Sequence, residues 1–333
     1  MGTFGERVSP RGLDEDDVRV RPSRGSRPRT RRRPRHADAI DALVVAVDRG
    51  RWTCRVGRDG AGREVVATRG GDLRRTPVVV GDVVALDADV SGETDALARM
   101  VRLAQRRSLL VRTPDDTETN EKPVVANAEL LVVVVALVRP EPQPRLIDRC
   151  LVAAYAGGLA PLLCLTKADL PAADDAELRG LYEPLDVPVI TLAPERSLTP
   201  LRDKLTGRMA VFFGSSGVGK SSLVNRLLPA ADQATGRVSG AGKGRHTTSA
   251  AIALPLPDGG WIIDTPGVRS LGLGGVTPSR VVAAFPDLAE AAEHCPPGCD
   301  HLTPGCAFDD PDVTGVVDAA RRSSLRRLLM ARG

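Results

Sequence analysis

The sequence has no long hydrophobic run and no secretory leader. The longest uninterrupted apolar stretch, Leu130 to Val138, has nine residues, about half the length of a membrane-spanning helix. The N-terminal segment is polar, first acidic and then basic, which does not fit a signal peptide. These absences predict a cytoplasmic protein that does not bind membranes.

Cysteine and aromatic residues are also scarce. Six cysteines occur in 333 residues, and a disulfide framework is not expected in so long a chain without an export signal. Trp52 is the only aromatic residue between positions 38 and 112. Base stacking in that region would therefore be sparse, and any RNA there would be held through its backbone.

Positive charge is concentrated at the N-terminus. The net charge is +4, but residues 1–36 hold 11 arginines and 5 acidic residues, which leaves the remainder at −2. Because these arginines lie among Pro, Ser and Gly with little to bury, residues 1–37 are predicted to be a disordered arm. The arm is either a solvated tail or a binder of phosphate backbones.

Residues 38–112 have the pattern of an all-β domain, with short strand-like runs separated by turns that contain Gly or Asp. The predicted strands are Ala42–Val47, Arg51–Val56, Glu64–Thr68, Val78–Leu86 and Ala98–Leu103. We expect a small barrel of the oligonucleotide-binding type, although periodicity does not separate it from an SH3-like barrel.

Strands and helices alternate over residues 113–278, which predicts a doubly wound α/β domain. The predicted strands are Leu130–Val138, Leu162–Leu165, Pro188–Leu192, Met209–Phe213, Ala251–Leu256 and Trp261–Ile263, and the predicted helices are Arg145–Ala156 and Ser221–Leu228. Residues 279–333 are predicted to form a helical domain with long loops. Its last helix, Ala319–Arg332, is basic and amphipathic, and its arginines are predicted either to pack on their own domain or to contact RNA.

The central motif is Gly-Ser-Ser-Gly-Val-Gly-Lys-Ser-Ser, which matches the phosphate loop of nucleoside triphosphatases. It lies between a predicted strand and a predicted helix, as phosphate binding by backbone N–H groups requires. Lys220 would reach the β- and γ-phosphates, and the Ser221 hydroxyl would ligate Mg²⁺. The competing interpretation is an ordinary turn with an exposed lysine. The predicted nucleotide-binding residues are Gly214, Ser215, Ser216, Gly217, Val218, Gly219, Lys220, Ser221 and Ser222.

Two more motifs follow predicted strands. In Asp264-Thr265-Pro266-Gly267, Asp264 would hold Mg²⁺ through water, and Gly267 would approach the γ-phosphate. In Thr166-Lys167-Ala168-Asp169, the aspartate would accept the N1–H and 2-amino donors of guanine, and Lys167 would lie along the base. Adenine lacks that donor pair and would leave the carboxylate unpaired.

A glycine-rich segment from Gly236 to Ser249 separates these motifs. It is where a mobile loop with a Mg²⁺-ligating threonine belongs, and Thr248 is favoured over Thr247. The residue after the Asp264 motif is Val268, so a water-orienting glutamine is missing there. His246 could orient the attacking water or accept its proton, or it could be a loop histidine without a role.

Three cysteines and a histidine gather near the C-terminus in the pattern Cys295-x3-Cys299-x-His301-x4-Cys306. Three thiolates and one imidazole make a complete tetrahedral shell for one structural Zn²⁺. His294 is the competing ligand. Because a full shell leaves no open position, we expect no catalysis at this metal.

The guanine motif precedes the phosphate loop, which reverses the common order and predicts a circularly permuted domain. The chain combines this permuted order with the barrel in front, the motifs Gly-Arg-His-Thr-Thr and Asp-Thr-Pro-Gly-Val-Arg, and the Cys/His cluster. In this combination it resembles the small-ribosomal-subunit-dependent GTPase A family over about residues 38–330. Two features depart from that family: Thr166 stands where the family usually has Asn, and the long arginine-rich arm is an addition. In the family pattern the two longer gaps of the metal cluster are each one residue greater.

The resemblance implies an oligonucleotide-binding barrel, a permuted GTPase domain and a zinc-binding helical domain. It also implies a GTPase of late small-subunit maturation that is stimulated by the subunit, with the subunit and its rRNA as partners and His246 as the catalytic histidine. We expect a monomer that binds GTP and GDP. The alternatives are an RNA-binding guanine-nucleotide switch with negligible catalysis, and an ATPase.

Overall fold

The computed structural model describes residues 36, 38–93, 95–112, 121–229, 251–265, 271–273, 276–310 and 319–331. Residues from Asp38 to Gly333 form one unit, and Met1–Ala37 form another. The arginine-rich arm predicted over residues 1–37 lies, apart from His36, outside the described residues. The description below therefore concerns the second unit.

A six-stranded sheet, in the order β10-β9-β8-β11-β13-β12, forms the centre of the α/β part. Five of the strands are parallel, and β12 is antiparallel to β13. The strand bounds are β8 (Leu130–Ala136), β9 (Ala160–Thr166), β10 (Val189–Thr191), β11 (Met209–Phe213), β12 (Ile252–Pro255) and β13 (Trp261–Asp264). The strand that carries the guanine motif, β9, precedes the phosphate-loop strand β11 in the chain, as the permuted order predicts.

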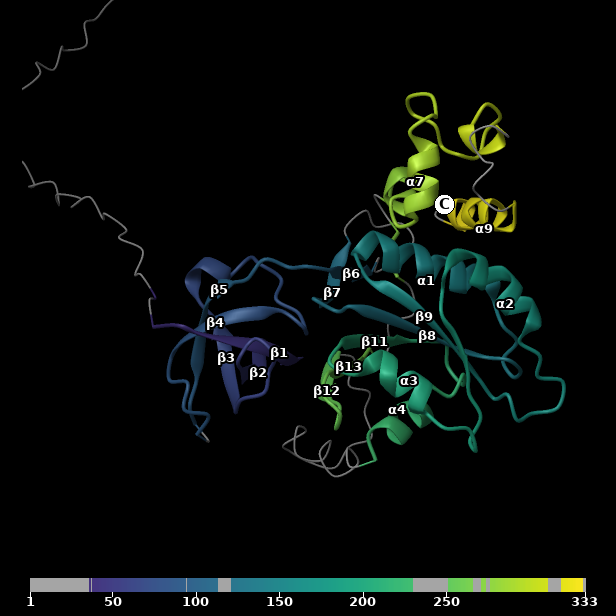
Figure 1. Ribbon diagram of the computed structural model, residues 1–333. Coiled ribbons are helices and arrows are strands. Elements are labelled where there is room, and N and C mark those ends of the chain that lie inside the picture. The colour runs from purple at the N-terminus through teal and green to yellow at the C-terminus, as the bar shows by residue number, and fades with distance from the viewer. Residues whose placement is uncertain are drawn as a thin grey trace, which may run out of the picture. The chain divides into compact units, whose positions relative to one another are not determined.

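Both faces of this sheet are buried, which explains why β8 is apolar throughout. Leu131, Val133 and Val135 belong to one core cluster, and Leu130, Val132, Val134 and Ala136 belong to the other. Figure 1 shows α1 and α2 on one face and α3 and α4 on the opposite face. The helix bounds are α1 (Pro144–Gly157), α2 (Ala176–Tyr182), α3 (Thr199–Leu205) and α4 (Lys220–Leu227).

The N-terminal domain is a five-stranded barrel. Its strands pair in the order β1-β2-β3-β5-β4, and a pairing between β1 and β4 closes it. The parallel pair β3–β5 breaks the meander and gives the Greek-key barrel of the oligonucleotide-binding type. The strand bounds are β1 (Ile40–Asp48), β2 (Arg51–Val56), β3 (Glu64–Arg69), β4 (Val83–Ala88) and β5 (Ala98–Leu103).

The fourth predicted strand of the barrel was wrong at its start. The predicted strand from Val78 to Leu86 does not form as one strand, because β4 begins only at Val83. Gly81 has φ +88°, and a β-carbon there would lie 1.9 Å from the Ala126 carbonyl oxygen. The chain therefore turns at Gly81, and Asp82 caps the turn by accepting the Val79 N–H at 2.8 Å.

A short hairpin-like pair joins the two domains and was not predicted. Strands β6 (Leu109–Arg112) and β7 (Lys122–Ala126) pair antiparallel. Asn127, which follows β7, is buried and has φ +58°. Its side-chain amide donates to the Gly81 carbonyl at 2.8 Å, and its side-chain oxygen accepts the Arg107 N–H at 2.9 Å. This side chain thus ties the barrel to the linker.

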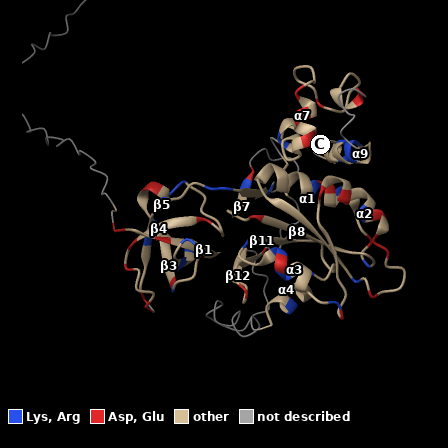
Figure 2. Cartoon of the chain, in the orientation of Figure 1, with Lys and Arg blue, Asp and Glu red and all other residues tan. Residues whose placement is uncertain are grey.

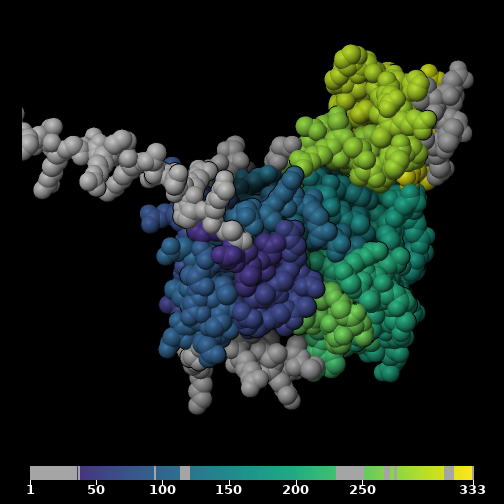
Figure 3. Space-filling model, turned by 60° about the vertical axis from the view of Figure 1, so that its left-hand side comes forward, coloured from purple at the N-terminus to yellow at the C-terminus, as the bar shows by residue number. Residues whose placement is uncertain are grey.

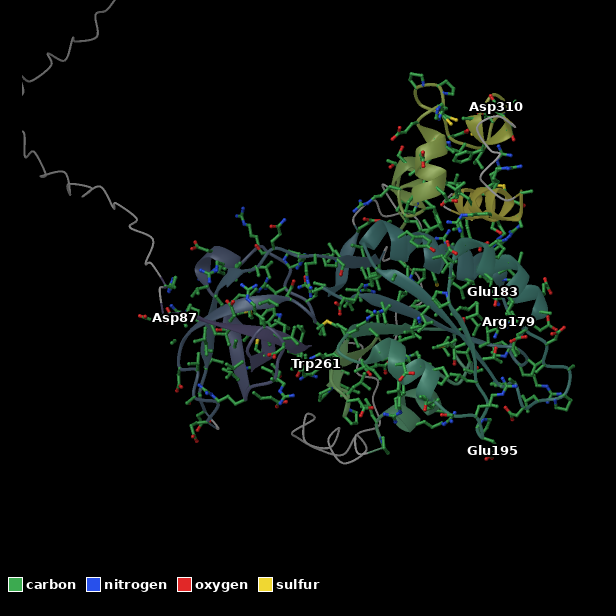
Figure 4. The ribbon with its side chains drawn as sticks, viewed as in Figure 1. Asp87, Arg179, Glu183, Glu195, Trp261 and Asp310 are labelled. Atoms are coloured by element: carbon green, nitrogen blue, oxygen red, sulfur yellow. The ribbon has the colours of Figure 1, made fainter. Side chains whose placement is uncertain are left out.

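The barrel also contacts the α/β sheet directly. Strand β1 pairs with β12, Ala46 opposite Ile252, so the two sheets are continuous. The Trp261 indole N–H donates to the Asp59 carbonyl at 2.9 Å, and Figure 4 labels this tryptophan between the barrel and β12. Figure 3 shows the same contact as purple β1–β2 atoms against green atoms of the β12–β13 region.

The described residues of the C-terminal part include the helices α6 (Pro278–Val282), α7 (Pro286–Ala292) and α9 (Ala319–Ala331). Its apolar side chains, including Val281, Leu288 and Leu325, join the core cluster on the α1 face of the sheet. None of the helices in the described part of the chain is both long and apolar enough to cross a membrane.

Candidate functional site

The phosphate-loop sequence connects β11 to α4, as predicted. Gly217 and Gly219 have φ of +81° and +91°, which residues with a β-carbon rarely adopt. A β-carbon on Gly214 would lie 2.6 Å from the Val134 carbonyl oxygen. Val218 is buried, whereas Ser215, Ser216, Ser221 and Ser222 are exposed. The glycines therefore set the shape of the loop, and its serines face outward at the start of the helix.

Lys220 and Asp264 meet at the same edge of the sheet. Strands β11 and β13 are parallel neighbours with Phe212 opposite Asp264, so Asp264 lies at the end of the strand beside the phosphate loop. The Lys220 ammonium forms an ion pair with the Asp264 carboxylate. Both side chains are mostly shielded from solvent. The two motifs that the sequence placed 44 residues apart are thus in direct contact.

The guanine motif lies against the phosphate loop on its other side. The Thr166 hydroxyl, which is buried, is 2.5 Å from the Val218 carbonyl and 3.2 Å from the Val135 carbonyl. It can donate only one hydrogen, and the shorter contact is the hydrogen bond. Lys167, at φ +60°, donates from its ammonium to the Arg139 carbonyl. Thr166 thus links the strand of the guanine motif to the phosphate loop.

A cavity of ≈ 440 Å³ opens beside these residues. Its wall contains Thr166, Lys167 and Asp169 from the guanine motif, and Gly219 and Ser222 from the phosphate loop. Asp169 is exposed, and its carboxylate has no hydrogen-bond or ion-pair partner among the described residues. The carboxylate is therefore free to accept donors from a ligand.

Sequence reasoning missed the segment after β10, which forms the rest of this cavity. Leu192, Ala193 and Pro194 line it. Arg226 of α4 also lines it and holds this segment through two backbone carbonyls, that of Ala193 at 3.1 Å and that of Arg196 at 2.9 Å. Their position in the sequence could have identified these residues, because residues that follow a parallel strand lie at the ligand-binding edge of the sheet.

Three predicted site residues lie outside the described residues: His246, Thr248 and Gly267. The described chain resumes at Ala251, and β12 begins with Ile252, which pairs with Asp264. Thr265, the last described residue before Gly267, is buried, and its hydroxyl lies 3.4 Å from the Phe212 carbonyl oxygen. Ile252 and Thr265, which lie close to these predicted site residues in the chain, are thus anchored beside the phosphate loop.

The predicted metal ligands come together. The ligand atoms of Cys295, Cys299, His301 and Cys306 all lie within 4.8 Å of one another. The Cys295 and Cys306 sulfurs are 3.7 Å apart, and they lie 3.5 and 3.7 Å from Nδ1 of His301. Tetrahedral Zn²⁺ would set S···S edges of about 3.8 Å and S···N edges of about 3.6 Å. The four residues therefore fit one zinc ion; His294, the competing ligand, is exposed and outside this group.

Surrounding groups hold this cluster in place. Backbone N–H groups of His301 and Phe308 donate to the sulfurs of Cys299 and Cys306 at 3.3 and 3.4 Å. The His301 ring stacks on Phe308 with centroids 4.9 Å apart. Arg326 of α9 donates to the His301 carbonyl at 3.1 Å. The metal-ligand segment is thus attached to the last helix as well as to its own loop.

The other arginines of α9 are used within the chain, which favours the packing alternative over an RNA contact for this helix. Figure 2 marks its basic residues in blue. Arg321 makes two bonds to Asp287 of α7, at 2.7 and 2.8 Å. The Nε–H of Arg327 is shared between the two carboxylate oxygens of the buried Asp148 of α1, at 3.0 and 3.2 Å. Burial raises the pKa of Asp148, against the opposing effect of the Arg327 charge.

Comparison with known proteins agrees with this arrangement. The family model described as RsgA GTPase matches residues 103–274. A protein of Alcanivorax borkumensis named "Small ribosomal subunit biogenesis GTPase RsgA" is 38% identical over 283 residues, which cover 81% of this chain and 78% of that protein. A protein of the same name from Pseudomonas aeruginosa is 41% identical over 261 residues, covering 76% of this chain and 75% of the relative.

Solved structures share the fold. The structure of YjeQ from Thermotoga maritima matches with a TM-score of 0.65 at 24% identity, over 88% of this chain and 98% of that one. The structure of YloQ, whose title calls it a circularly permuted GTPase, matches with a TM-score of 0.63 at 24% identity, over 90% of this chain and 96% of its own. The family model covers just over half of the sequence, and the curated relatives exceed a third in identity over most of its length. The chain therefore belongs to the RsgA GTPase family.

Proposed function

We propose that this protein binds GTP at the edge of the sheet where the phosphate loop and the guanine motif meet, and that it hydrolyses GTP during maturation of the small ribosomal subunit. As a member of the RsgA GTPase family it is a GTP hydrolase. The ribosomal role is carried over from the names of its curated relatives. The observation that carries the site is the ≈ 440 Å³ cavity, because residues of both motifs line it.

In this proposal the phosphates lie on the backbone of residues 214–222, at the N-terminus of α4, where the N–H groups and the helix dipole favour negative charge. Lys220 binds the β- and γ-phosphates. Ser221 and Thr248 would ligate Mg²⁺ and Asp264 would hold it through water; a bound ion would shield the phosphate charge. The contact between Lys220 and Asp264 supports this assignment, since it places the two groups at one point of the sheet edge.

The base lies in the cavity with its donor edge on Asp169. A carboxylate there accepts two parallel hydrogen bonds from guanine, whereas adenine would leave it unpaired and desolvated. The free carboxylate of Asp169 and the apolar wall of Leu192 and Leu223 support a base rather than a phosphate at this point. Lys167, near the Arg139 carbonyl, lies along the base plane. The ATPase alternative predicts no such preference.

We assign the water-activating role to His246. It lies six positions before Ile252, which pairs with Asp264, and an extended chain of six residues reaches about 20 Å. The histidine is therefore within reach of a γ-phosphate bound at Lys220. A neutral imidazole can orient a water or accept its proton. Gly267, which follows Asp264 by three residues, would approach the same phosphate through its backbone.

The Cys₃His cluster would hold one structural zinc ion. A bound Zn²⁺ would cross-link the segment from Cys295 to Cys306 and, with all four positions filled, would leave none for substrate. Its place beside α9 supports a role in holding the C-terminal helices together.

The barrel and the arginine-rich arm are proposed to contact rRNA, through phosphate charge rather than base stacking. The protein would act as a monomer in the cytoplasm, where ribosomal subunits mature.

GTP turnover with and without purified small ribosomal subunits tests the proposal. We expect slow turnover alone and strong stimulation by subunits, because the subunit would order the loop that carries His246. His246→Ala should abolish stimulated turnover and leave GTP binding intact. Tight GTP binding without any stimulation would instead support the switch-protein alternative.

A further inference from the structure

A second cavity, of ≈ 320 Å³, lies where the barrel linker meets the α/β domain. Four parts of the chain form it: the linker and β6 (Arg106–Leu109 and Val111), Glu121 just before β7, the end of α1 (Ala153, Ala156 and Gly157), and Gly272, Val276 and Arg280 after the Asp264 motif. A β-carbon on Gly157 would lie 2.7 Å from the Leu109 carbonyl oxygen, so α1 and β6 are in close contact. The proposed GTP site does not use these residues.

The charged groups around this cavity are not satisfied by the protein. Glu121 lines it, and its Oε1 atom is buried without a hydrogen-bond partner. Arg107 and Arg280 also line it, are exposed, and have no side-chain partner among the described residues. The third arginine, Arg106, is instead held by Asp82 through bonds of 2.8 Å. Buried polar atoms without partners are uncommon, and each calls for an explanation.

The charges define what could bind. A simple anion would be attracted by the two free arginines but repelled by Glu121. A simple cation would be attracted by Glu121 but repelled by the arginines. A ligand must therefore offer hydrogen-bond donors to Glu121 and negative charge to the arginines. The remaining wall is aliphatic, from residues such as Leu109, Ala153 and Val276, which suits the flat faces of a base. The volume is at the lower end of the range for small-ligand sites.

We propose that this cavity binds one nucleoside monophosphate unit, with the amino edge of the base on Glu121 and the phosphate on Arg107 and Arg280. The unit is either a free nucleotide or an unpaired nucleotide of RNA, since RNA-binding proteins take up splayed-out bases in this way. The RNA source rests on the proposed function, because it needs the small subunit as partner.

A ligand here would touch the segment that follows the Asp264 motif. The Gly272 N–H donates to the Val111 carbonyl at 2.9 Å, so that segment is attached to β6 on the cavity wall. A bound nucleotide would add a second link, through Arg280. Occupancy of the cavity would thus bear on the segment that follows Gly267, the residue proposed above to approach the γ-phosphate.

The test measures binding of CMP, AMP and UMP to the full-length protein by titration calorimetry, with GDP saturating the guanine site. Uracil presents one donor between two acceptor oxygens, so UMP should bind about fivefold or more weakly than CMP or AMP. Glu121→Gln should weaken CMP and AMP about fivefold and leave UMP within twofold. Arg107→Ala and Arg280→Ala should each weaken all three about threefold.

Arg145→Ala is the matched control, because Arg145 is exposed and lies about 12 Å along α1 from Ala153, the nearest cavity residue on that helix. It should bind like wild type. Short single-stranded RNAs of C, A or U distinguish the source: affinity far above that of the mononucleotide indicates RNA, and equal affinity indicates a free nucleotide. No binding by either form, or binding that the three cavity variants leave unchanged, would overturn the proposal. Turnover measured with and without subunits on the same samples reports on the proposed function separately.

Discussion

The hydroxyl of Thr166 offers a direct test of how the base site and the phosphate loop are joined. Thr166→Val keeps the β-branched shape in β9 and removes only the group that bonds the Val218 carbonyl at 2.5 Å. Because Thr166 is buried, loss of this bond should cost about 1–2 kcal/mol. If the cost falls on the ordered phosphate loop, GDP affinity should decrease roughly 5- to 30-fold.

The assay is equilibrium binding of a fluorescent GDP analogue, together with thermal unfolding without nucleotide. Thr166→Ser keeps the hydroxyl and should bind GDP within about threefold of wild type. Thr166→Asn, with the residue usual in the related family, should also retain binding because its amide can donate to the same carbonyl. If Thr166→Val bound GDP as tightly as wild type, the proposed link between the two motifs would be wrong.

Four further predictions concern other parts of the structure. Arg226→Ala should weaken GDP binding about tenfold with little change in turnover of bound GTP, because two carbonyls of the cavity wall lose their donor; single-turnover kinetics would separate these effects. Cys306→Ser, or a strong chelator, should remove one equivalent of zinc by elemental analysis and lower the unfolding temperature while GDP still binds. Asn127→Ala should destabilise the protein by about 2–3 kcal/mol in urea unfolding, since two buried bonds are lost. Burial raises the pKa of Asp287, but hydrogen bonds from Arg321 outweigh this effect and lower the pKa overall. The ion pair therefore stabilises the folded protein above about pH 4, and this contribution is lost as the pH falls through the pKa of Asp287 in the folded state. Asp287→Asn should reduce the loss of stability at acid pH in urea titrations.

The sequence was most informative where a pattern has a single structural solution. The apolar run from Leu130 to Val138 predicted a strand buried on both faces, and β8 forms there but ends at Ala136. The phosphate loop required a strand before it and a helix after it. The predicted β11, Met209–Phe213, agrees at both ends with the structure. The Cys₃His spacing likewise predicted a cluster that the structure assembles.

Elsewhere the pattern had more than one solution, or gave no signal. The apolar residues Val78 to Val80 resemble the start of a strand, but Val80 is buried beside Val125 of β7 and does not continue into β4. The residues after β10 contribute backbone and apolar surface to the base cavity, so no reactive side chain marked them. The arginines of α9 could not be assigned from charge alone, since their partners, Asp148 and Asp287, are distant in the sequence.

The continuity of β1 with β12 has a consequence for how the chain can be divided. Strand β12 is the last strand of the α/β sheet on that side, and β1 covers its free hydrogen-bonding edge. A shortened chain beginning at residue 113 would expose that edge, and Trp261 would lose the acceptor for its indole N–H. Exposed sheet edges pair with other chains. The GTPase part is therefore expected to aggregate when produced without its barrel, and it would also lose Leu43, Val45 and Val80 from the core cluster on the α1 face of its sheet.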